Sequence, residues 1–144
     1  MLAEINEQIA QFPTWIQRWL VWMQFILIVC PVLFIKFREA QALVVAQVFN
    51  FAVGAVVVIL QNYQVTKLFG LGHVFWAVAF VYILRRWLKG KIKLQGFDAY
   101  NLAYVVWLPT AMLTLVVSLV FDGYDLVAYA NGLRMPLIEY YNQR

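Results

Sequence analysis

Four long apolar stretches limit what this chain can fold into. They cover about residues 15–35, 40–62, 68–88 and 99–121. A helix crosses the hydrocarbon core of a bilayer with about 20 apolar residues, and each stretch reaches that length. Because backbone amides inside lipid need hydrogen-bond partners within their own segment, we predict a helix for each stretch.

The composition of the chain points to the same class. Of its 144 residues, 65% are hydrophobic and 12% are charged, whereas a soluble domain is about half apolar and about a quarter charged. A soluble fold of this size cannot bury so many apolar residues. We therefore expect an all-α integral membrane protein.

The connections between the apolar stretches are short, which predicts an up-down four-helix bundle. They cover about residues 36–39, 63–67 and 89–98. Loops of this length force consecutive helices to lie antiparallel and in contact. No room remains for a separate globular domain, so residues 1–144 are expected to form a single transmembrane domain.

Both ends of the chain are expected to be interfacial tails, over residues 1–13 and 122–144. The first tail is predicted to contain a short amphipathic helix, because its apolar residues recur at helical spacing until Pro13. The second tail stays apolar after Asp122 and Gly123, which we expect to end the fourth helix.

Basic residues predict the orientation in the membrane. Five of the eleven Lys and Arg residues gather around the third connection and two lie in the first. Cytoplasmic loops carry such an excess, so we expect the loop over residues 89–98 in the cytoplasm and both termini outside, in a bacterial inner membrane. The five residues are Arg85, Arg86, Lys89, Lys91 and Lys93. They set the orientation or, alternatively, bind lipid headgroups or an acidic partner, and they are too few for a nucleic-acid site.

Polar residues inside the spans fall on narrow helix faces. One face of the second span carries Gln47, Asn50, Gly54 and Gln61, and one face of the fourth carries Thr110, Thr114 and Ser118. On the first span, Gln17, Gln24 and Pro31 repeat every seven residues. Each polar group in lipid needs a partner or water, so these stripes indicate helix packing or, alternatively, the lining of a hydrated pore.

A polar cluster is expected at the outer ends of the helices. His73 is the only histidine, and the antiparallel order places it near Asp122 and Asp125. A histidine with a carboxylate neighbour can relay protons or ligate a metal. The simpler interpretation is a polar residue at the interface that water satisfies. With Cys30 as the only cysteine, we expect no metal site and no cofactor.

The sequence favours a role in assembly over catalysis. It contains no GxSxG, HExxH, Walker or dinucleotide-binding motif, so we expect no enzyme. The first hypothesis is an accessory subunit that packs through its polar helix faces against itself, as a homo-oligomer, or against a larger membrane complex. The alternative is a small homo-oligomeric channel for ions or solutes, lined by the stripe of the second or the fourth span. A third hypothesis is a subunit that binds a cofactor or a lipid through His73.

Overall fold

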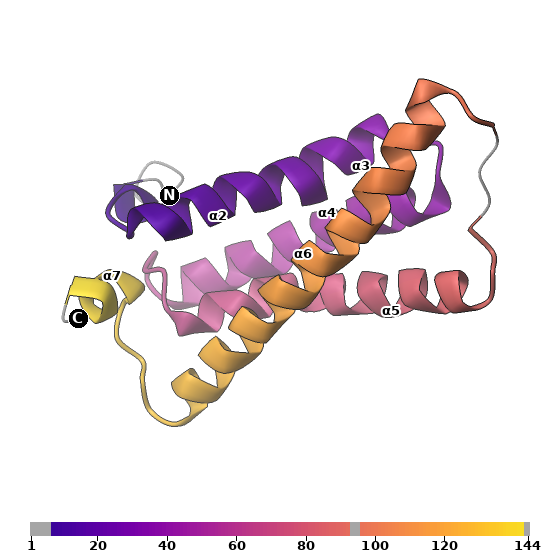
Figure 1. Ribbon diagram of the computed structural model, residues 1–144. Coiled ribbons are helices and arrows are strands. Elements are labelled where there is room, and N and C mark those ends of the chain that lie inside the picture. Colours follow the sequence, from indigo (N-terminus) through magenta and orange to yellow (C-terminus); the bar gives the residue numbers. More distant parts are fainter. Residues whose placement is uncertain (1–6, 93–95, 143–144) are drawn as a thin grey trace.

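The computed structural model describes residues 7–92 and 96–142, and it confirms four long helices (Figure 1). The helices that are long and apolar enough to cross a membrane cover Thr14–Leu33, Arg38–Leu60, Lys67–Leu88 and Ala99–Ala130. Consecutive helices run in opposite directions, and the last one crosses the other three obliquely (Figure 1). Within the described ranges there is no strand beyond an isolated bridge between Thr66 and Pro136.

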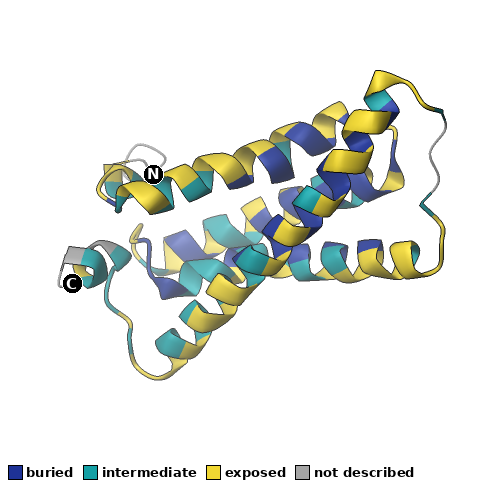
Figure 2. Cartoon of the chain, in the orientation of Figure 1, coloured by how far each residue is buried: buried dark blue, intermediate teal, exposed yellow. Residues whose placement is uncertain are grey.

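Several of these helices are composite. The elements in chain order are α2 (Thr14–Gln24), the π-helical η1 (Phe25–Val29), α3 (Cys30–Leu33), α4 (Arg38–Leu60), the 3₁₀-helical η2 (Lys67–His73), α5 (Val74–Leu88), α6 (Ala99–Ala130) and α7 (Leu137–Asn142). Buried residues line the inner faces of the long helices, and exposed residues cover the outside (Figure 2).

The π turn in the first span arises next to a proline, and it permits a hydrogen bond to another helix. In η1 the amide of Cys30 bonds to the carbonyl of Phe25, five residues earlier. The next amide in this pattern would come from Pro31, which has none. The carbonyl of Ile26 is therefore free, and it accepts a hydrogen bond of 2.9 Å from the indole of Trp107 on α6.

The π turn also places the residues of the seven-residue repeat in the first span on different faces of the helix. Pro31 is buried, whereas Gln24 is exposed, so the two do not share one face. A π turn inserts one residue into the helix and rotates everything after it by about 100°. The repeat therefore does not mark a continuous interface.

The fourth helix is longer than predicted. It continues to Ala130, so Asp122, Gly123 and Asp125 lie within α6. A single glycine costs a helix only about 1 kcal/mol, and apolar residues continue the pattern after it. The chain leaves the helix at Asn131, and Gly132 takes a positive φ of 97° there.

Two glycines bring the second and third spans into close contact. A Cβ atom built on Gly72 would lie 3.1 Å from the Cα atom of Gly54, whereas a Cβ atom on Gly54 itself would meet nothing within 4 Å. Small residues permit such close backbone contact between membrane helices. The contact sets how η2 lies against α4.

These glycines form a matched pair for a stability test. We expect Gly72→Ala to lower the free energy of unfolding in detergent micelles by about 1–3 kcal/mol, because the new methyl group meets backbone atoms that cannot move aside. Gly54→Ala should leave stability unchanged or raise it, because alanine favours the helix and has room. Equal losses from the two substitutions would contradict this packing.

Candidate functional site

The polar stripe of the second span faces α5. Gln47 accepts a hydrogen bond of 3.1 Å from the indole of Trp76, and Asn50 accepts one of 3.0 Å from the backbone amide of Phe75. The side-chain amide nitrogen of Asn50 has no partner in the described part of the chain. Gln61 lies just beyond the end of α4 and is half-buried. Gln47, Asn50 and Gly54 therefore pack against the third span, and Gln61 does not join them.

In the polar stripe of the fourth span, two side chains contact the first span and one bonds within its own helix. Thr114 accepts a hydrogen bond of 3.1 Å from the indole of Trp22, and the hydroxyl of Ser118 donates to the sulfur of Met23 at 2.9 Å. The hydroxyl of Thr110 bonds to a carbonyl of its own helix, four residues earlier. A pore lined by this stripe would have to break these contacts. Pore lining and contact with another chain remain predictions for both stripes.

A buried polar cluster at the base-rich end was missed by the sequence analysis. Glu39, placed there in the first connection, lies in the first turn of α4 and is 3% exposed. Its carboxylate accepts hydrogen bonds from Arg86 at 2.6 Å and from the hydroxyl of Tyr104 at 2.9 Å. The ring of Tyr104 stacks on Phe37. A carboxylate in the first turn of a helix, where it suits the helix dipole, was the available signal.

This cluster distinguishes Arg86 from the other predicted headgroup contacts. Its guanidinium points inward to Glu39 and also donates to the carbonyl of Lys91 at 3.3 Å. Arg85, Lys89 and Lys91 have exposed side chains that can reach headgroups. Lys93 lies outside the described residues.

An ion pair and a histidine–carboxylate hydrogen bond join η2 to α6 at the opposite end. A ring nitrogen of His73, Nδ1, lies 3.0 and 3.1 Å from the two carboxylate oxygens of Asp122. Lys67, which the sequence analysis did not select, lies 2.6 Å from Asp125. A Cβ atom on Gly70 would come within 3.1 Å of Asp122, so this glycine lets the two elements approach. The structure thus brings His73, Asp122 and Asp125 to one end of the molecule.

Aromatic rings cover both of these contacts. His73 lies parallel to Trp76, with 4.3 Å between ring centroids. The ammonium of Lys67 lies 4.2 Å from the ring centroid of Tyr140 and 5.4 Å from that of Tyr124. Cations are attracted to the faces of such rings. Lys67 is consequently sealed, and its side chain is 1% exposed.

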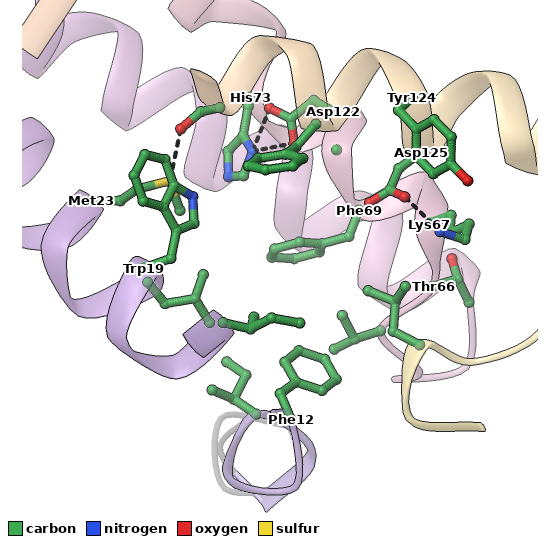
Figure 3. A pocket seen from close by; sticks show the side chains of 18 of the residues that line it. Phe12, Trp19, Met23, Thr66, Lys67, Phe69, His73, Asp122, Tyr124 and Asp125 are labelled. Carbon is green, nitrogen blue, oxygen red and sulfur yellow. Dashed lines mark hydrogen bonds and ion pairs between the residues drawn. The ribbon is translucent and has the colours of Figure 1, made fainter. Parts of the chain in front are cut away.

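A cavity of about 550 Å³ opens beside these pairs (Figure 3). Its wall is mainly apolar and comes from α2, α6, η2, α7 and the N-terminal segment. Phe12 is buried on the floor of the cavity, and Gln8 ties the N-terminal segment to the second connection by hydrogen bonds with Tyr63 and Val65. The N-terminal tail thus packs on the protein. Among the described residues, no group of three or more His, Cys, Asp or Glu side chains is arranged to hold a metal ion.

Comparison with known proteins finds no counterpart for this arrangement. No family model matches the chain, and neither the curated proteins nor the solved structures include a match. The functional assignment therefore depends on the chemistry of the residues themselves.

The buried cluster predicts an energetic role for the hydroxyl of Tyr104. We expect Tyr104→Phe to lower the free energy of unfolding by about 1–3 kcal/mol, because the carboxylate of Glu39 loses a buried donor. Tyr129→Phe is the control, since Tyr129 is half-buried and its hydroxyl makes no hydrogen bond in the described chain. Thermal unfolding of the purified variants measures both effects. A loss no larger for Tyr104→Phe than for the control would count against the cluster.

Proposed function

We propose that this chain is an integral protein of a bacterial inner membrane that crosses the bilayer four times and associates with a second copy of itself through α2. In this role it is an assembly component without catalysis of its own. The four apolar helices support the membrane location, and the absence of enzyme motifs supports the non-catalytic role.

The observation that carries the proposal is the side chain of Gln24. It lies near the middle of the span Thr14–Leu33, it is exposed, and it makes no hydrogen bond in the described part of the chain. Its neighbours Val21 and Phe25 are exposed apolar residues. An unpartnered amide in hydrocarbon costs several kcal/mol, and mid-bilayer water is absent.

A second copy of the chain can supply the missing hydrogen-bond partner of Gln24. A glutamine amide both donates and accepts, so the same residue on two copies is self-complementary across a two-fold axis. By contrast, the stripes of the second and fourth spans already make hydrogen bonds inside the chain. They lend less support to assembly, or to a channel, than the sequence alone suggests.

Removing the amide should weaken self-association in liposomes. We expect Gln24→Leu to raise the dimer dissociation constant about three- to twentyfold, since hydrogen bonds between membrane helices contribute about 0.6–1.7 kcal/mol. Energy transfer between labelled copies at several protein-to-lipid ratios measures the constant.

Two further variants control for this change. Gln24→Asn keeps an amide and should retain most of the association. Gln41→Leu removes an amide that already bonds within the chain, to the carbonyl of Ile35, and should have no effect on it. Energy transfer that does not rise with protein density, or that is equal in Gln24→Leu and the native chain, would refute self-association through this face.

The proposed orientation places both base-rich connections in the cytoplasm. The first and third connections lie at the same end of the molecule, opposite the second (Figure 1). The exposed bases there include Lys36, Arg38 and Lys89. Such an excess marks the cytoplasmic side.

Single-cysteine labelling of intact cells tests this orientation. In a Cys30→Ser background, we expect a membrane-impermeant maleimide to label Gln64→Cys and not Lys91→Cys, because only the second connection faces outward. Permeabilised cells should label both positions, which are exposed in the fold. Labelling of Lys91→Cys alone in intact cells would reverse the assignment.

A further inference from the structure

We propose that the cavity at the outer end binds a hydrophobic cation, that is, a small molecule with an apolar body and a positively charged, ammonium-like centre. This inference goes beyond self-association and does not depend on it. It follows from the size and lining of the cavity, from which charges remain accessible, and from the aromatic rings around them.

The cavity has the dimensions and lining of a small-molecule site. Ligand pockets have volumes of about 300–1,000 Å³ with mainly apolar walls and a few convergent polar groups. This cavity of about 550 Å³ has apolar walls that include Leu20, Met23 and Leu137. Its polar groups converge from η2 and α6, as Figure 3 shows for His73, Asp122 and Asp125.

The accessible charge in the cavity is negative. The side chain of Lys67 is 1% exposed, whereas that of its partner Asp125 is 27% exposed and that of Asp122 is 17% exposed. With His73 neutral, two carboxylates and one ammonium leave a formal charge of −1 at this wall. A carboxylate can only accept hydrogen bonds, so Nδ1 of His73 donates to Asp122 and Nε2 is left as a further acceptor. A cation fits these groups, and an anion does not.

Aromatic faces add to this selectivity. Phe69, Phe121 and Tyr124 also line the cavity, and Figure 3 shows Phe69 and Tyr124 on the same side as Asp122 and Asp125. The negative face of an aromatic ring attracts a cation and repels an anion, most strongly where water is excluded. The rings therefore favour the same sign of charge as the carboxylates.

A second groove adjoins the cavity on the surface that would face lipid. A groove on the outside of α2 and α6 shares Trp15, Trp19 and Phe121 with the cavity. Trp19 and Phe121 meet edge to face, with 6.4 Å between ring centroids. These shared rings form the wall between the groove and the cavity, so the site lies next to the surface that would face lipid.

Tetraphenylphosphonium and tetraphenylborate test the proposal, because the two ions have nearly the same size and shape and opposite charge. Equilibrium dialysis of the full-length protein in detergent micelles, corrected with empty micelles, measures the binding of each. We expect one saturable site per chain for the cation and only micelle-like partitioning for the anion. Saturable binding of the anion with equal affinity, or no saturable binding of the cation, would overturn the proposal.

Two variants locate the site by independent means. Asp122→Asn removes a charge while its side-chain oxygen can still accept from His73, and it should weaken cation binding about tenfold or more. Leu20→Trp leaves the charges in place and fills part of the cavity, and it should weaken cation binding as well. Thermal unfolding of both variants establishes that they are folded.

A matched control separates the site from surface charge. Glu139→Gln removes an exposed acid at the same end that does not line the cavity, and it should leave cation affinity within twofold of the native chain. If Asp122→Asn and Glu139→Gln change the affinity equally, the cation binds by general attraction and the cavity is not its site. Self-association through Gln24 would be untouched by that result.

Discussion

Pairing of polar groups within an apolar bundle is the constraint on which this structure depends. Three of the hydrogen bonds between helices use a tryptophan indole as donor, from Trp22, Trp76 and Trp107. The indole is suited to this task, because it combines a large apolar surface with a single donor that reaches across to the next helix. The bundle thus satisfies most of its buried amides and hydroxyls internally, which makes the unpartnered Gln24 informative.

Carboxylates pair with basic side chains at both ends of the bundle, but they stay accessible at only one end. At the base-rich end, Arg86 and Tyr104 both donate hydrogen bonds to the carboxylate of Glu39, so this carboxylate is buried and has no access to a ligand. At the other end, the 3₁₀ geometry of η2 and the small size of Gly70 bring the ion pairs to α6 while leaving a cavity beside them. The contacts at the base-rich end therefore stabilise the fold, whereas the carboxylates at the other end remain accessible to a ligand.

Sequence patterns predicted where the helices lie better than they predicted which side chains contact one another. The four apolar helices were visible in the sequence because each reaches the length that crossing a hydrocarbon core requires. The predicted end of the fourth helix was wrong because Asp122 and Gly123 are only weak helix breakers, and apolar residues continue the helical pattern after them to Ala130. Glu39 and Lys67 were missed, since a charge at the edge of a span has the same pattern whether it faces water or a partner from a distant segment.

What the sequence by itself determined is the class: four apolar helices with short connections, base-rich on one side, whose backbone must be satisfied locally. Only the tertiary structure decided which polar side chains are already satisfied and which are not, because the bonds between helices join residues far apart in the chain. The cavity belongs to the second category as well. Its walls come from both ends of the chain and from three of the long helices, and no local pattern records how such segments converge.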